Sequence, residues 1–290
     1  MHAYLTGERQ GYYSDYGRVQ DFPTLFEETF VLTGGYSRHR DRCYGAPIGG
    51  LPGDRFVVCL QNHDQIGNRA QGERLGTLLS PPAQRLAASL LLLAPHLPLL
   101  FMREEYGEEQ PFLFFCSFGD ADLVEAVRRG RRAEFEAFHA DGGVIPDPQA
   151  EATFAASCLT WRWEDTPHRA GLRRLYQDLL TARRRWPALR DFTQCTARLL
   201  PGTVPQALLE VQRGAQTLQP DQTLHMYWNL TALPQPCPYP QMLARLWSSE
   251  DELYYGARRA STPLEQLLPY ECVVFGPAAW RSYCAEETSR

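Results

Sequence analysis

Two short apolar segments, each ending abruptly in polar residues, constrain the fold of this chain more than any other feature. Residues 56–60 (FVVCL) run into Gln61-Asn62-His63-Asp64-Gln65, and residues 97–102 (LPLLFM) run into Arg103-Glu104-Glu105. Short, continuous apolar runs are typical of strands that are buried on both faces of a parallel sheet. We therefore predict two such strands, with chemical groups at their carboxyl ends, where parallel α/β units carry their reactive residues.

A helix is predicted between these strands. Ser80 followed by Pro81 favours a helix start, because Ser can cap the first turn and Pro suits its first position. Leu86, Leu90 and Leu93 continue an apolar face at helical spacing. The order strand, helix, strand predicts an α/β unit.

The remaining chain divides at about Asp191. The other helices are expected in part of residues 3–30, in residues 122–138 with an interruption at Gly130, and around residues 172–180 up to Trp186-Pro187. The Gly-, Arg- and Pro-rich stretch 34–54 predicts a long loop, and such loops are usually functional. After Asp191, short β-prone runs between Pro- and Gly-rich turns predict a small antiparallel domain. The expected domains are residues 1–190 and 191–290.

Composition excludes several classes of protein. The 290 residues carry a net charge of −5, which argues against binding to nucleic acid or to an acidic membrane surface. The amino terminus lacks the apolar segment of a secretory signal, and the longest apolar run, residues 86–102, is too short and too Pro-rich to span a bilayer. The eight Cys have no zinc or redox spacing, so reduced thiols are expected. Together with the lack of a signal or membrane segment, this predicts a cytoplasmic location. No cofactor is expected.

The polar segment after the first strand is the leading candidate site. Asn62 and Asn68 are two of only three Asn in the chain, and five consecutive hydrogen-bonding side chains at the end of a buried strand are costly unless something uses them. The segment could simply cap the strand end and a neighbouring helix. It could also bind a polyhydroxylated ligand through Asn, His, Asp and Arg side chains. As a metal site it is weak, because only His63 and Asp64 are adjacent.

The second strand end adds carboxylates and an aromatic ring. Neighbouring strands lie roughly 4.8 Å apart, and retaining glycosidases need two carboxyl groups about 5–5.5 Å apart. Asp64 with Glu104 or Glu105 is therefore a rival catalytic pair, although either Glu could merely begin a solvated loop. Aromatic side chains either stack on sugars or fill the core; they are Tyr12, Tyr13, Tyr16, Tyr106, Phe112, Phe114 and Phe115.

At these motifs the sequence resembles the maltooligosyltrehalose trehalohydrolases, within the α-amylase-like glycoside hydrolase family 13. The stretch QNHDQIGNRAQGERL (61–75) is the most specific match. Supporting matches are LTGERQGYYSDYG (5–17), PLLFMREEYGEEQPFLFF (98–115), EAVRRGRRAEF (125–135), SSEDELYYG (248–256) and LLPY (267–270). They follow the expected order over nearly the whole chain.

The resemblance implies a fold and a set of roles. It implies the last part of a (β/α)8 barrel, with strands seven and eight and their helices, followed by an antiparallel β-domain. The implied reaction is hydrolysis, with retention, of the α-1,4 bond next to a terminal trehalose unit. Asp64 would be the third carboxylate that stabilises the transition state. The expected substrate-binding residues are Gln61, Asn62, His63, Arg69, Glu104, Glu105 and Tyr106, with no metal.

Two departures from the family limit what this chain is expected to do. The resemblance puts the nucleophilic Asp and the acid/base Glu on strands upstream of Met1, and no segment here matches them, so the chain alone is predicted to be inactive. Arg103 stands where the family usually has Gly, and it would narrow the site or pair with Glu104. Expected partners are an α-glucan substrate, the missing barrel half and, functionally, maltooligosyltrehalose synthase. The alternative is a non-catalytic α-glucan-binding or interaction module.

Overall fold

The computed structural model describes residues 1–136, 145–201, 207–214, 222–238, 240–259 and 261–281. Contacts divide the chain into two compact units. Unit 1 comprises Met1–Leu60, Ser80–Leu99 and Trp163–Arg290, and unit 2 comprises Gln61–Leu79 and Leu100–Arg162. This division differs from the predicted boundary at residue 190, which stays a prediction.

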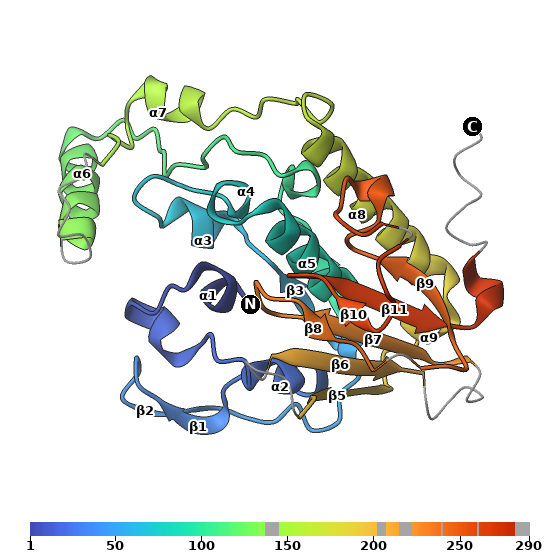
Figure 1. The fold of residues 1–290 in the computed structure, drawn as a ribbon. Coiled ribbons are helices and arrows are strands. Elements are labelled where there is room, and N and C mark those ends of the chain that lie inside the picture. The colour runs from blue at the N-terminus through green and yellow to red at the C-terminus, as the bar shows by residue number, and fades with distance from the viewer. Residues whose placement is uncertain (137–144, 202–206, 215–221, 239, 260, 282–290) are drawn as a thin grey trace. The chain divides into compact units, whose positions relative to one another are not determined.

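Unit 1 is built around a five-stranded antiparallel sheet (Figure 1). Its strand order is β5-β6-β7-β11-β9, and every neighbouring pair is antiparallel. The strands are β5 (Cys195–Leu199), β6 (Leu208–Arg213), β7 (Leu224–Asn229), β9 (Ala244–Ser248) and β11 (Cys272–Gly276). The antiparallel sheet predicted after Asp191 is therefore confirmed.

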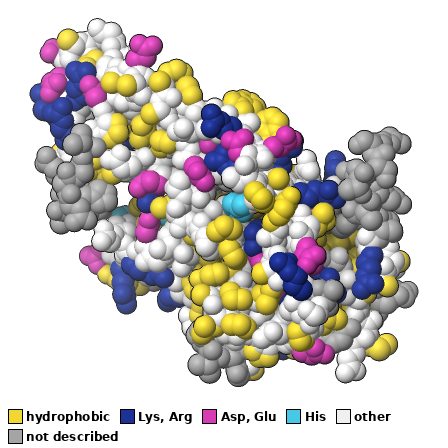
Figure 2. Space-filling view, turned by 45° about the horizontal axis from the view of Figure 1, so that its top comes forward, with side chains coloured by type: hydrophobic (Ala, Val, Ile, Leu, Met, Phe, Trp, Pro, Cys, Tyr) yellow, Lys and Arg dark blue, Asp and Glu magenta, His cyan; other side chains and the backbone are white. Residues whose placement is uncertain are grey.

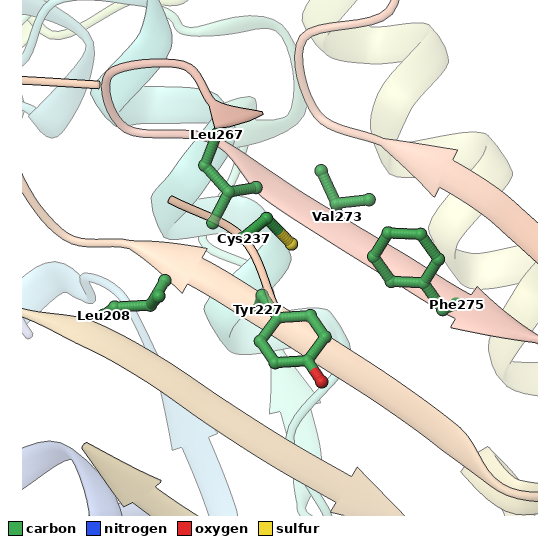
Figure 3. Packing of buried hydrophobic residues seen from close by; sticks show 6 residues of the cluster. All are labelled: Leu208, Tyr227, Cys237, Leu267, Val273 and Phe275. Atoms are coloured by element: carbon green, nitrogen blue, oxygen red, sulfur yellow. The ribbon is translucent and has the colours of Figure 1, made fainter. Parts of the chain in front are cut away.

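The sheet buries side chains against helix α5 and against a small β-ribbon. The indole Nε1 of Trp228 on β7 donates to Ser89 Oγ on α5 (Pro81–Leu92) at 2.9 Å. The ribbon consists of β8 (Gln235–Pro236) and β10 (Gln266–Leu267). Figure 3 shows the buried cluster that joins the sheet to this ribbon; its members are Leu208, Tyr227, Cys237, Leu267, Val273 and Phe275.

The helices of unit 1 largely follow the sequence. The α5 helix begins directly after Ser80, as predicted, and packs against α8 (Pro167–Arg185). Thr166 caps α8, since its Oγ1 accepts from Arg169 N at 3.2 Å, and Trp186 ends it. The remaining helices are α1 (His2–Thr6), α2 (Asp21–Glu27) and α9 (Pro187–Arg190). None of the described helices is long and apolar enough to cross a membrane.

The two predicted parallel strands form, but they are not buried on both faces. Strands β3 (Val57–Cys59) and β4 (Leu97–Leu99) pair in parallel. Val57 is 65% exposed, Leu97 39% and Leu99 43%. Burial on both faces is wrong: within the described residues the pair forms a separate two-stranded sheet, and burial of a parallel sheet requires elements that cover each of its faces. The described residues form no closed barrel.

The predicted long loop at 34–54 also contains structure. Strands β1 (Thr33–Ser37) and β2 (Arg42–Gly45) form an antiparallel hairpin within it. Gly45 has a φ of 84°, and a Cβ there would lie 1.8 Å from the carbonyl oxygen of Leu32. The Gly content that suggested a loop is thus what permits close strand pairing.

Unit 2 contains four α-helices within its described residues, namely α3 (His63–Gly67), α4 (Leu75–Leu78), α6 (Ala121–Glu136) and α7 (Glu151–Ala156). The predicted interruption at Gly130 is wrong, because α6 continues through it. A single Gly costs a helix interior only about 1 kcal/mol, and Arg128 anchors this helix by a bidentate contact to Asp147 at 2.9–3.1 Å. The last two residues of the predicted helix, 137 and 138, lie outside the described residues.

Candidate functional site

Helix α3 presents His63 and Asp64 to solvent. Asn62 precedes the helix, and its Oδ1 accepts from the backbone N–H of Gln65 at 2.9 Å, as an N-cap does. The side chains of His63 and Asp64 are 69% and 75% exposed, and His63 Nε2 lies 3.4 Å from Asp64 Oδ1. The capping interpretation therefore accounts for Asn62, while the two residues after it remain accessible to a ligand.

Buried hydrogen bonds join the segments that follow the two parallel strands. Gln61 Nε2 donates to Glu104 Oε2 at 3.4 Å, and Gln61 Oε1 accepts from Leu75 N at 3.0 Å. The same Glu104 oxygen accepts from Phe101 N at 3.2 Å. Gln61 and Glu104 are both buried, at 4% and 6% exposed. They fix the loops that carry α3 and the turn η3 (Glu104–Tyr106).

Arg103 lies at the start of that turn in a left-handed conformation, with φ 65°. Its guanidinium carbon sits 3.4 Å from the ring centroid of Trp161, and its Nη1 lies 3.5 Å from Glu105 Oε1. The ion pair expected with Glu104 is thus seen with the neighbouring Glu105. The Gly that the resemblance leads us to expect at this position would suit this backbone, because Gly adopts positive φ without a Cβ penalty.

Arg103→Ala is expected to be less stable than Arg103→Gly by about 1 kcal/mol. Both variants lose the contacts to Trp161 and Glu105, so the difference reports only backbone strain. Urea unfolding followed by circular dichroism measures it. The same two substitutions at Arg132, exposed inside α6, should give the opposite order, because Ala is favoured over Gly in a helix. Equal stabilities of Arg103→Ala and Arg103→Gly would contradict the inferred backbone strain at this position.

Glu108 is the centre of a buried polar cluster in unit 2. It is 1% exposed and accepts hydrogen bonds from the backbone N–H groups of Glu109, Gln110 and Thr160 at 2.9–3.1 Å. The hydroxyl of Tyr106, itself fully buried, donates to it at 2.9 Å. Burial alone raises the pKa of Glu108, but hydrogen bonds from Gln110, Thr160 and Tyr106 outweigh it and lower the pKa to about 2.

Two buried arginines hold the same loops by donating to carbonyl groups. Arg74 donates to Met102 O at 2.8 Å and to Gln110 O at 2.6 Å, with its guanidinium 4.9 Å from the Phe101 ring. Arg131 on α6 donates to Gly67 O, at the end of α3, at 2.9 Å. Burial lowers the pKa of both guanidinium groups, since burial disfavours the charged form.

Sequence reasoning missed Arg74, Glu108 and Arg131. The available signal was weak: all three lie within the matched motif segments, but nothing in the pattern separates them from exposed charges. Arg69, which was predicted, is partly buried and contacts Glu73 Oε2 through its Nε at 3.2 Å. Within the described residues, no three His, Cys, Asp or Glu side chains are arranged to hold a metal ion.

The aromatic residues divide between the two units. In unit 2, Phe112 packs edge-on against Phe101 and Phe115, with ring centroids 5.5 and 5.8 Å away. Phe114 and Phe115 remain 38% and 37% exposed. In unit 1, the ring centroids of Tyr12 and Tyr13 lie 4.2 Å apart. Neither the sugar-stacking nor the core interpretation describes the whole set.

The chain is similar in structure and sequence to an α-amylase-like protein. A crystal structure of an α-amylase-like protein from Salmonella typhimurium matches 94% of this chain with a TM-score of 0.76 and 31% identity, and the match covers 44% of that protein. No protein-family model matches the chain.

Within this class, the chain is related to the malto-oligosyltrehalose trehalohydrolases, as the motifs indicated. It is 46% identical to the Saccharolobus solfataricus protein of that name over 165 residues, which are 57% of this chain and 28% of that protein. It is 42% identical to the one from Arthrobacter ramosus over 188 residues, or 64% of this chain and 33% of that protein. The chain therefore spans about a third of the length of these curated relatives.

Proposed function

We propose that this chain supplies one side of the substrate site of a trehalose-releasing glycosidase, with Asp64 as the carboxylate that holds sugar hydroxyls and stabilises the distorted, positively charged transition state. One observation carries the proposal. The His63–Asp64 pair is exposed on a helix whose loop is fixed by buried hydrogen bonds. A preorganised, accessible carboxylate beside an imidazole suits a polyhydroxylated ligand.

The other predicted residues divide into two roles in this proposal. His63, Arg69 and Glu105 retain accessible surface and would contact the sugar chain. Gln61, Glu104 and Tyr106 are buried, so they would support the loops that present those residues. Asn62 would do both, because its cap fixes α3 directly before His63.

Catalysis would need further groups. A retaining glycosidase uses a nucleophile and a proton donor about 5–5.5 Å apart. Glu104 is a poor partner for Asp64 in that chemistry, because it is buried and hydrogen-bonded to Gln61 and Phe101. We therefore propose that this chain is inactive alone. In this proposal β3 and β4 are strands seven and eight of a barrel, and the other barrel strands carry the missing carboxylates. In this arrangement residues 191–290 form the accompanying β-domain. A synthase would provide the trehalose-ended maltooligosaccharide in the cytoplasm.

Calorimetric titration with maltotriosyltrehalose tests the binding half of this proposal. Asp64→Asn is expected to weaken binding at least tenfold, because hydrogen bonds to a charged group contribute about 1.5–3 kcal/mol. Asp54→Asn, an exposed carboxylate in unit 1, is the matched control and should bind like the native chain. Near-UV circular dichroism verifies folding in each case.

Release of trehalose tests the catalytic half. The native chain is expected to bind without releasing trehalose. Release that disappears in Asp64→Asn would show that the site is complete within these residues. Binding that is insensitive to Asp64 would contradict the assignment of this carboxylate, and a folded chain without any glucan binding would contradict the proposed function altogether.

A further inference from the structure

Trp161 is held in place by the buried cluster around Glu108. The preceding residue, Thr160, donates to Glu108 through both its backbone N–H and its hydroxyl, each at 2.9 Å. The backbone N–H of Trp161 itself hydrogen-bonds the hydroxyl of Tyr106. Tyr106 and Glu108 are at most 1% exposed. The backbone at Trp161 is thus fixed by two groups that cannot move without disturbing the interior of unit 2.

The same residue carries backbone strain. Trp161 has a φ of 60°, a conformation that costs a bulky residue about 1–2 kcal/mol. Arg103, which contacts it, has a φ of 65°. Strained backbone of this kind persists where surrounding structure over-determines it, and it clusters at ligand-binding positions. Two such residues in contact point to a constrained geometry that serves something other than stability.

The fixed backbone supports an indole that faces solvent. Trp161 is 55% exposed, although Trp side chains are on average largely buried. The guanidinium of Arg103 lies 3.4 Å from the ring centroid and covers one face, while Glu105 holds that guanidinium at 3.5 Å. The ring is therefore braced from one side and leaves surface open.

Contacts connect this ring to the loop of Asp64. Arg103 directly precedes Glu104, which is hydrogen-bonded to Gln61, and Gln61 directly precedes the N-cap of the helix that bears Asp64. Trp161, Arg103 and Asp64 all belong to unit 2. The relative positions of the Trp161 ring and the Asp64 carboxylate are therefore determined within unit 2.

We propose that Trp161 is a stacking platform for a glucose ring of the same α-glucan chain that engages Asp64, with Arg103 as the positioning residue that braces the indole. This inference rests on the proposed function. The flat apolar faces of glucose rings match an exposed indole, and a rigid Trp offers large contact area at a low cost in conformational entropy. Platform and carboxylate together would select an oligosaccharide over a single sugar.

Titration of the native chain and its variants with maltotriosyltrehalose tests the platform. Trp161→Leu should weaken binding about tenfold, which corresponds to roughly 1.4 kcal/mol, whereas Trp161→Phe, which keeps an aromatic face, should stay within about threefold. Trp163→Leu is the matched control, because Trp163 is partly exposed and likewise has an arginine, Arg173, at 5.0 Å from its ring, but belongs to unit 1. It should bind like the native chain.

Intrinsic fluorescence gives a second readout that does not depend on Trp161→Leu folding. Ligand should change the tryptophan emission of the native chain and of Trp163→Leu, and this change should vanish in Trp161→Phe while binding persists. Native-like binding by folded Trp161→Leu, with the fluorescence change retained in Trp161→Phe, overturns the platform alone if Asp64→Asn still weakens binding at least tenfold. Equal losses in Trp161→Leu and Trp163→Leu overturn it as well. A native chain that binds no glucan overturns both the platform and the proposed function.

Discussion

Glu250→Ala is expected to lower the free energy of unfolding by about 3–5 kcal/mol, because it leaves a buried arginine without its counter-ion. Arg85 on α5 donates to both carboxylate oxygens of Glu250 at 2.7–2.9 Å, and the two side chains are 4% and 2% exposed. Glu250 also accepts from the backbone N–H of Ala257 at 3.1 Å. The pair joins α5 to the segment after β9, so its loss affects the core of unit 1.

The pair itself is not expected to be strongly stabilising. Burial raises the pKa of Glu250, although Arg85 opposes that shift, and the cost of burying two charges commonly matches or exceeds their attraction. Replacing both residues, as Arg85→Met with Glu250→Leu, should therefore recover most of the loss. Guanidinium unfolding followed by circular dichroism measures all three variants.

An exposed ion pair in the same segment provides the control. Arg259 and Glu252 lie 3.3 Å apart with side chains 59% and 64% exposed. Glu252→Ala should cost less than about 1 kcal/mol, as is usual for exposed pairs. A Glu250→Ala variant no less stable than Glu252→Ala would contradict the importance assigned to the buried pair, as would a double variant less stable than the single one.

Glu108→Gln is expected to destabilise the chain by about 3 kcal/mol at neutral pH, because it removes a buried charge whose hydrogen bonds lower the folded pKa to about 2. The native pKa of about 2 stands below the usual 4.5. A lowered carboxyl pKa stabilises the folded state above pH 4.5, and this contribution disappears as the pH falls from 4.5 towards 2. The difference in free energy of unfolding between the native chain and Glu108→Gln should become smaller as the pH falls over that range.

Urea unfolding at pH 7, 5, 4 and 3 measures this gap. Comparing differences between native chain and variant cancels the titration of all other carboxylates, including Glu210, whose pKa is also about 2. The neighbouring exposed Glu109 is the control, and Glu109→Gln should change stability little at any of these values. A gap that stays constant with pH would show that Glu108→Gln acts through altered packing rather than through the lost carboxylate.

The tertiary structure leaves several apolar side chains on the surface. On the face shown in Figure 2, hydrophobic side chains reach the surface in patches between charged ones. Independently of that view, Val57, Leu97 and Leu99 of the two-stranded parallel sheet are exposed. Within the described residues this sheet has only two strands, and exposed apolar strands favour pairing with further strands, which the proposed additional barrel strands would supply.

The sequence by itself determined the elements whose pattern is local. Ser80-Pro81 and the leucines after it predicted α5, and the apolar runs at 56–60 and 97–102 predicted a parallel pair of strands. The polar residues after those runs marked the segment that carries Asp64. Helix caps, apolar periodicity and strand ends depend on residues that are close in the sequence, so they can be predicted without a structure.

Only the tertiary structure decided which charged and aromatic residues are buried. Glu104, Glu105 and Glu108 look alike in the sequence, yet the first supports a loop, the second faces Arg103 and the third binds the segment that carries Trp161. The exposure of Val57 was also not predictable, because it depends on which other elements pack against the faces of β3. Burial and pairing arise from contacts between residues distant in the chain, and those contacts leave no trace in local pattern.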